Sequence, residues 1–125
     1  MIVGFGVDIA EVDRLEDAIT RRGRPFIERV FTPLEIAYCE RFRYSAERYA
    51  ARFAAKEAAM KALGTGGARG VRWVDIEVAR LASGQPTLEL RGAARQHADR
   101  MGVSRIHLSL THSGKLAFAE VIFES

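Results

Sequence analysis

Cysteine, histidine and proline are all scarce in this chain of 125 residues, which holds one cysteine, three histidines and three prolines. Cys39 has no partner for an internal disulfide, so we expect a reducing, cytoplasmic location. A structural zinc site needs a cluster of cysteine or histidine ligands. Three scattered histidines, His97, His107 and His112, do not supply such a cluster.

Long apolar runs and several catalytic motifs are also missing. No stretch approaches the roughly 20 apolar residues that span a bilayer, and the N-terminus lacks the features of a signal peptide. We therefore expect no membrane association. No G-x-S-x-G is present, which argues against a serine hydrolase with a nucleophile elbow. The glycine-rich stretch at 64–70 has no Gly-Lys-Ser/Thr after it and is not a P-loop.

The composition that is present fits one compact globular domain, residues 1–125, with 48% hydrophobic and 28% charged residues. The net charge of +3 is mild, but arginines crowd one early segment. Such a patch suits an acidic protein, a phosphorylated ligand or nucleic acid, although a solvated helix face would look the same. The patch consists of Arg14, Arg21, Arg22, Arg24 and Arg29.

Apolar periodicity and capping residues predict an α+β fold, with helices packed on a mostly antiparallel sheet. Thr32, Pro33 and Glu35 form a capping box at a helix start, and the helix would carry Leu34 inward. Helices are expected at 11–22, 32–42, 45–64 and 92–102, with a short helical turn at 25–31. Strands are expected at 2–9, 71–80, 87–91, 105–111 and 116–123.

The first strand, "MIVGFGVD", has two unlike faces because alternate residues share a face. One face is apolar and the other is nearly bare beside an acid, which would let a ligand or another backbone come close. An unpaired carboxylate on a buried strand is costly unless it is paired or holds a metal. The apolar face consists of Val3, Phe5, Val7 and Ile9, and the other face of Ile2, Gly4, Gly6 and Asp8.

The helix sequence "RFAAKEAAMK" places Glu57 and Lys61 four residues apart on one face. Standing alone, this spacing is typical of a weak surface salt bridge. Together with Asp8 it acquires a second interpretation, since Mg²⁺ takes one or two protein carboxylates and completes its shell with water and phosphate. The neighbouring Arg52 and Lys56 would then face a phosphorylated ligand.

Three stretches, "GVDIAEVDRL", "RFAAKEAAMKALG" and "SLTHSGKLAFAEVI", resemble the bacterial holo-acyl-carrier-protein synthases in order and spacing. The resemblance covers essentially the whole chain. It implies a Mg²⁺-dependent transferase that moves the 4′-phosphopantetheine arm of coenzyme A to a serine of an acidic apo-acyl carrier protein. The second product is adenosine 3′,5′-bisphosphate, and the setting is fatty acid biosynthesis. The resemblance also implies a homotrimer with active sites between subunits.

The same resemblance assigns roles to individual residues. Asp8 and Glu57 match the metal-binding acids, and Lys61 matches a catalytic lysine beside the reacting phosphate. Which group removes the proton from serine, and which subunit supplies each half of a site, stay open. Coenzyme A phosphate contacts are implied for Arg52, Lys56 and His112, and adenine contacts for Gly84 and Pro86. Carrier-protein docking is implied for Arg14, Arg21, Arg24 and Phe26.

Two rival functions follow from the residues. A nucleic-acid-binding module would use the arginine patch, but the sequence has no zinc-finger spacing and no aromatic RNA-binding signature. A Mg²⁺-dependent phosphohydrolase would use the same acids and release phosphate without a carrier protein. The sequence does not identify the preferred carrier protein or tolerance for acylated coenzyme A.

Overall fold

The computed structural model describes residues 1–125 and has the expected α+β architecture. Its five strands form two antiparallel sheets, of order β1-β5-β4 and β2-β3. The helices are α1 (Val12–Arg22), α2 (Arg24–Val30), α3 (Pro33–Cys39), α4 (Ser45–Leu63) and α5 (Gly92–Met101). The strands are β1 (Ile2–Glu11), β2 (Ile76–Arg80), β3 (Pro86–Leu90), β4 (Arg105–Ser113) and β5 (Leu116–Glu124).

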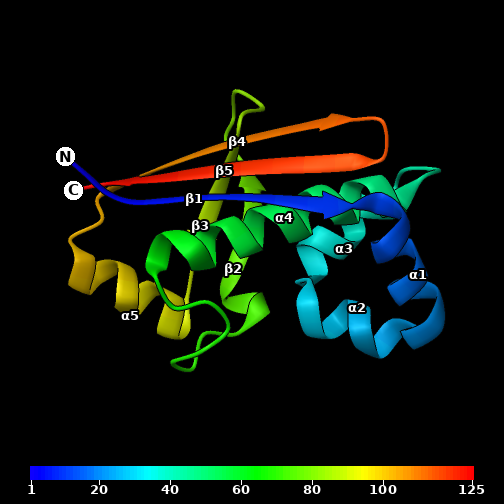
Figure 1. The fold of residues 1–125 in the computed structure, drawn as a ribbon, viewed down its shortest axis with the longest axis horizontal. Helices are drawn as coiled ribbons and strands as arrows, with labels where there is room; N and C mark the ends of the chain where they lie inside the picture. Colours follow the sequence, from blue (N-terminus) through cyan, green and yellow to red (C-terminus); the bar gives the residue numbers. More distant parts are fainter.

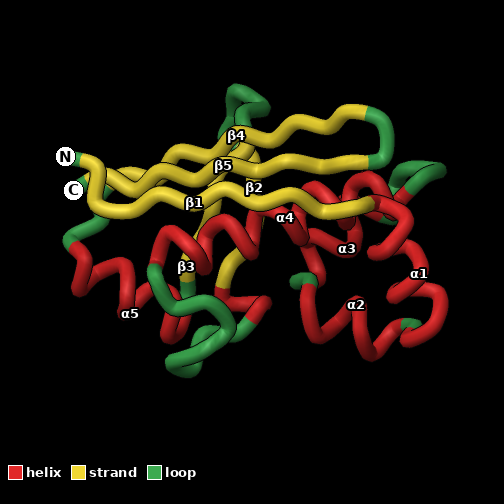
Figure 2. Tube along the Cα trace, in the orientation of Figure 1, coloured by secondary structure: helices red, strands yellow, loops and turns green.

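The larger sheet forms a long layer, and α4 runs beneath it against β1 and β5 (Figure 1). Helices α1, α2 and α3 gather at one end of this layer, while α5 lies at the opposite end (Figure 2). The core fills the space between α4 and the sheet, where alanines of α4 face Ala119, Val121 and Phe123 of β5. None of the helices combines the length and apolar character that crossing a membrane requires.

Backbone contact between β1 and α4 explains the two glycines of the first strand. A Cβ at Gly6 would lie 1.9 Å from the carbonyl oxygen of Ala58, and one at Gly4 would lie 2.6 Å from that of Ala62. Only glycine fits such an approach. The bare face of β1 therefore accommodates the backbone of α4, which brings Asp8 beside the middle of that helix.

The same contact turns the apolar face of β1 outward. Phe5, Val7 and Ile9 are 55%, 48% and 55% exposed, whereas Gly6 and Ala10 are buried. Because alternate residues of a strand point to opposite faces, a strand that buries its glycines must expose these larger side chains. The chain thus presents an unusual apolar stripe to its surroundings.

The strand predicted over 71–80 is wrong in its first half. Residues Trp73–Asp75 form a 3₁₀ helix, and β2 begins only at Ile76. The carboxylate of Asp75 accepts hydrogen bonds from the backbone and the guanidinium of Arg72, at 3.0 and 2.9 Å. This local capping competes with strand pairing and bends the chain before β2.

Helix α3 begins at Pro33 with the predicted capping box, but it packs on a different side than expected. Leu34 is exposed, whereas Glu35 is buried. The Glu35 carboxylate accepts hydrogen bonds from the backbone nitrogens of Thr32 and Val78, at 2.9 and 2.8 Å. A cap that also bonds to β2 anchors the helix more firmly than one leucine would.

Candidate active site

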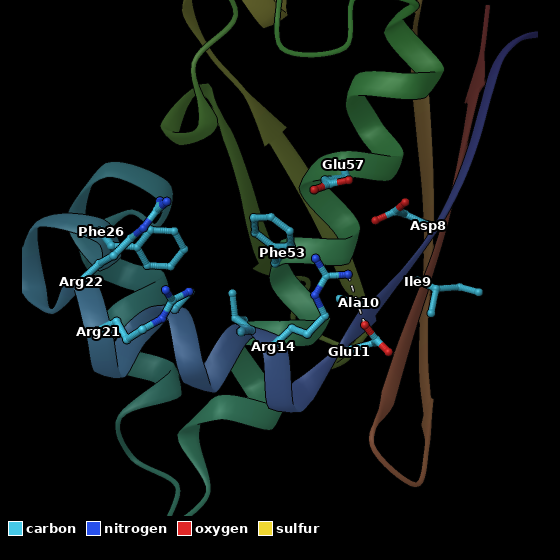
Figure 3. A pocket seen from close by; sticks show the side chains of 12 residues that line it. Asp8, Ile9, Ala10, Glu11, Arg14, Arg21, Arg22, Phe26, Phe53 and Glu57 are labelled. Carbon is cyan, nitrogen blue, oxygen red and sulfur yellow. Dashed lines mark hydrogen bonds and ion pairs between the residues drawn. The ribbon is translucent and has the colours of Figure 1, made fainter.

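A cavity of about 450 Å³ opens between β1, α1, α2 and α4 (Figure 3). The cavity lies between the two acids that the sequence singles out and the arginines of α1. The acids lie at one end, on β1 and α4, and the arginines project from α1 (Figure 3). Its walls include Asp8, Glu57, Arg14, Arg21, Phe26 and Phe53.

Asp8 and Glu57 point toward one another across the gap between β1 and α4 (Figure 3). Burial raises the pKa of Glu57, and the negative charge of Asp8 and a hydrogen bond to it raise the pKa further. Two carboxylates in contact cannot both stay ionised at low cost. A proton or a cation between the two carboxylates would therefore stabilise the pair, and so would a nearby positive side chain.

Lys61 supplies such a side chain, because its Nζ donates to Asp8 Oδ1 at 2.9 Å and to the Val7 carbonyl oxygen at 3.0 Å. The bond to Asp8 raises the pKa of Lys61. The sequence spacing would also allow Lys61 to pair with Glu57, its neighbour one turn earlier on α4. The ion pair instead joins α4 to β1.

The donor set suits a hard divalent cation. Asp8 and Glu57 supply carboxylate oxygens, and the structure has no group of three or more histidine, cysteine, aspartate or glutamate side chains that could hold a metal. Mg²⁺ is bound in this way, through one or two carboxylates with water and phosphate oxygens completing an octahedron. The repulsion that raises the pKa of Glu57 is the repulsion that a cation would relieve.

Lys56 is not beside this cavity. Its side chain is 0% exposed and forms an ion pair of 2.7 Å with Glu35. It also donates to the carbonyl oxygens of Trp73 and Ile76. The expected contact with a coenzyme A phosphate is therefore not available to Lys56, because a buried ammonium with three partners has no proton left to donate.

The remaining coenzyme A residues lie apart from the acids. Arg52 lines a second cavity, of about 320 Å³, on the side of α4 that faces α3 and β2. Arg80 lines it too and donates to the Gly84 carbonyl oxygen at 2.7 Å, which ties the turn before Pro86 to this side. His112 is exposed near the end of β4. Within one chain, Asp8 and Glu57 line the first cavity but not the second.

Three of the four predicted docking residues, Arg14, Arg21 and Phe26, line the first cavity with the acids. Arg24 does not, since its guanidinium binds the Glu40 carboxylate at 2.7 Å. Arg22 lines the cavity beside them and was not chosen from the sequence. Its helical position one residue after Arg21 and its place in the arginine patch were the available signals.

Phe53 of α4 is a further wall of the first cavity. Its ring stacks on Trp73 at a centroid distance of 5.0 Å, so it packs on one side and lines the cavity with the other. Tyr38 and Arg80, which line the second cavity, were also not chosen. No motif of the sequence distinguished them from surface residues.

Comparison with known proteins finds similar chains among the holo-[acyl-carrier-protein] synthases. The chain is 58% identical to the holo-[acyl-carrier-protein] synthase of Solibacter usitatus over 100% of both chains. The crystal structure of the Neisseria meningitidis holo-[acyl-carrier-protein] synthase superposes with a TM-score of 0.90 at 32% identity, covering 100% of each chain. The Bacillus anthracis enzyme, solved in complex with CoA (3′,5′-ADP), gives 0.81 at 37% identity, covering 100% of this chain and 98% of that one.

A family model described as the 4′-phosphopantetheinyl transferase superfamily matches residues 4–119. The match spans most of β1 with Asp8, the whole of α4 with Glu57 and Lys61, and the start of β5. On this match and on the full-length identity to curated synthases, the chain belongs to the 4′-phosphopantetheinyl transferase superfamily.

Proposed function

We propose that this protein transfers the 4′-phosphopantetheine arm of coenzyme A to a serine of an apo-acyl carrier protein. The observation that carries the proposal is the meeting of Asp8, Glu57 and Lys61 at one end of an arginine-bearing cavity. Full-length similarity to holo-[acyl-carrier-protein] synthases supports it, as does the bound CoA (3′,5′-ADP) of the Bacillus anthracis relative. Fatty acid biosynthesis in the bacterial cytoplasm is the setting that we infer.

The reaction forms a bond between the serine oxygen and phosphorus and breaks one P–O bond of the pyrophosphate, releasing adenosine 3′,5′-bisphosphate. Mg²⁺ held by Asp8 and Glu57 would neutralise charge on the pyrophosphate oxygens. The Lys61 ammonium, held by Asp8 at 2.9 Å, is placed to stabilise the phosphoryl oxygens. A carboxylate of this pair would accept the proton of the serine hydroxyl, directly or through a water.

The carrier protein would dock on the rim of the first cavity. Arg14, Arg21 and Arg22 are exposed there, and Phe26 adds an apolar contact between them and the cavity wall. Opposite charge accelerates encounter and fixes orientation more than it adds affinity. An acidic partner held at this rim would point its serine toward the acids on β1 and α4.

A homotrimer is the oligomeric state that we infer, with each site completed by a neighbouring copy. The stripe of Phe5, Val7 and Ile9 extends to β5 at its two ends, because Phe5 pairs with Ile122 and Ile9 pairs with Phe118, while Val7 pairs with the charged Glu120. An exposed apolar face of this kind is typical of a subunit interface. Within one chain, Arg52 lines a different cavity from Asp8 and Glu57. A neighbouring copy would bring its Arg52 to the acids of this chain.

The test is the mass of apo-acyl carrier protein after incubation with this protein, coenzyme A and Mg²⁺. We expect one added phosphopantetheine per carrier protein, and none without coenzyme A or with chelator in excess of the metal. Phosphate release without a mass change would instead support a phosphohydrolase. Salt-dependent binding of oligonucleotides with no covalent product would support a nucleic-acid module. Sedimentation velocity of the same sample measures the oligomeric state.

A further inference from the structure

Arg24, the one predicted docking residue outside the first cavity, is held by a contact between three elements. Its Nη1 donates to Glu40 Oε2 at 2.7 Å, and the Tyr49 hydroxyl donates to the same oxygen at 2.9 Å. A longer contact of 3.5 Å with Glu28 stays within α2. The residues Arg24, Glu40 and Tyr49, here called the Glu40 clamp, join the start of α2 to the end of α3 and to α4.

The Glu40 clamp differs from the ion pairs of the other arginines at the rim. Arg14 and Arg21 bind acids only three and four residues away, whose side chains are more than half exposed. Glu40 lies sixteen residues from Arg24 in the chain. Tyr49, which is only 1% exposed, holds the Glu40 carboxylate from the side of the core. An ion pair near the surface contributes more when it belongs to such a fixed network than when both side chains are free to move.

Helix α2 depends on such an anchor because it is short and follows a glycine corner. It has seven residues, and an isolated helix of that length is not stable in water. Gly23, with a φ of 71°, both ends α1 and precedes α2. Because glycine is conformationally permissive, the corner alone does not fix the angle between the two helices. Ile27 and Val30 bury the middle and the end of α2, and Arg24 secures its start.

The secured turn carries part of the wall of the first cavity. Phe26 lines the cavity two residues after Arg24, and the Arg22 guanidinium lies 5.6 Å from the centroid of the Phe26 ring (Figure 3). A shift of this turn would move the surface at which the carrier protein docks, so the inference rests on the proposed function. We propose that Arg24 and Glu40 are positioning residues, which hold Phe26 and Arg22 toward the carrier protein while Arg24 itself does not contact it.

The experiment is a double-mutant cycle of Arg24→Gln, Glu40→Gln and the variant with both changes, assayed by modification of an apo-acyl carrier protein. Both side chains are about half exposed, at 52% and 42%, so neither change should prevent folding. Because the two residues act as one unit, each single variant and the double variant should raise the KM for carrier protein by the same factor, about fivefold. The KM for coenzyme A and kcat should stay within about twofold of the wild type.

Glu40→Gln gives the sharpest comparison, because charge alone predicts the opposite result. The change removes a negative charge beside the arginine patch, so an Arg24 in direct contact with an acidic carrier protein would lower the KM. The proposal requires that KM to rise. Amide hydrogen exchange is a readout independent of activity. The amides of Phe26 and Ile27, which bond to the Gly23 carbonyl oxygen at 3.2 and 3.4 Å, should exchange about fivefold faster in this variant, while those of α5 should not change.

The proposal is overturned if Glu40→Gln lowers or does not change the KM for carrier protein, if the effects of the two single variants add in the double variant, or if the amides of α2 exchange at the wild-type rate. Arg21→Gln is the matched control for direct contact, since Arg21 lines the cavity, and its effect should add to that of Glu40→Gln. Arg100→Gln on α5 should change neither KM. Failure of the wild type to modify any carrier protein would remove the proposed function, whereas the exchange rates test the Glu40 clamp by themselves.

Discussion

The two faces of α4 carry adjacent charged residues in opposite situations. Lys56 is fully buried, and its ammonium is satisfied by Glu35 and by the carbonyl oxygens of Trp73 and Ile76. Glu57, the next residue, is half-buried and faces the like charge of Asp8. At Lys56 the charge has its partner inside the chain, whereas at Glu57 the nearest carboxylate carries a charge of the same sign. The ion pair of Lys56 stabilises the fold, and Glu57 faces the proposed metal site.

The pKa shifts of the two residues express the same difference. Burial lowers the pKa of Lys56, and the opposite charge of Glu35 counteracts this. Burial raises the pKa of Glu57, and the like charge of Asp8 adds to it. A neighbour of opposite sign offsets the cost of burial, while a neighbour of the same sign increases it. Repulsion between partly buried groups of like charge is expected where a ligand is to be bound.

Breaking the buried pair should have the largest effect. Lys56→Met leaves the Glu35 carboxylate buried without its cation, so we expect a loss of about 3–5 kcal/mol in the free energy of unfolding. Urea denaturation followed by circular dichroism measures it. Lys61→Met on the other face is the matched control and should cost less, because the Lys61 side chain is 55% exposed. Equal losses in the two variants would show that the faces do not differ as described.

Glu57→Gln, unlike Lys56→Met, should increase the stability of the fold, and it should strongly reduce modification of the carrier protein. Glu57→Gln should lower carrier-protein modification at saturating Mg²⁺ by at least about 100-fold, or about 2.7 kcal/mol. The same variant should melt about 2–4 °C higher than the wild type without metal, because the repulsion from Asp8 is gone. Thermal unfolding in the presence of chelator measures this second quantity.

The pH dependence of that gain has a definite sign. A carboxyl whose pKa is raised in the folded state binds its proton more tightly when folded, so protonation stabilises the fold as the pH falls. The melting difference between Glu57→Gln and the wild type should therefore be greatest above the folded pKa of Glu57. It should vanish below the ordinary value of 4.5, where both states are protonated. A difference that does not change with pH would exclude Glu57 as its source.

The smallest effect should come from charge at the rim of the first cavity. Arg14→Glu should raise the KM for carrier protein about tenfold at low salt, and high salt should shrink the difference. The KM for coenzyme A should stay constant, and so should stability, since the Arg14–Glu11 ion pair is exposed. Arg100→Glu on α5 makes the same charge change outside the cavity. If both reversals raise the KM equally, only net charge matters.

Local sequence rules predicted the parts of the site that lie on single elements. The span of α4, the capping box at Thr32 and the helical spacing of Glu57 and Lys61 follow from propensity and periodicity, which act within one turn. The motif resemblance then placed Asp8 beside them. These predictions held because none of them depends on which side of an element faces the core.

The sequence could not predict which side of a helix or strand faces the core. The apolar face of β1 is normally the buried face, yet the close approach of Ala58 requires glycine and reverses the strand. Lys56 reads as a surface cation until Glu35 is found buried opposite it. Arg24 belongs to the arginine patch by sequence but is bound by Glu40. Each of these outcomes depends on a long-range neighbour that no local pattern specifies.

The contact between Gly6 and Ala58 also keeps the distance between the two acids constant when residues elsewhere are substituted. Asp8 is two residues beyond this contact and Glu57 one residue before it, so peptide units rather than side chains determine the gap between the carboxylates. Side chains can repack after substitution, but abutting main chains cannot yield without separating the strand from the helix. The core around Phe123 is therefore free to vary while the two acids keep their spacing.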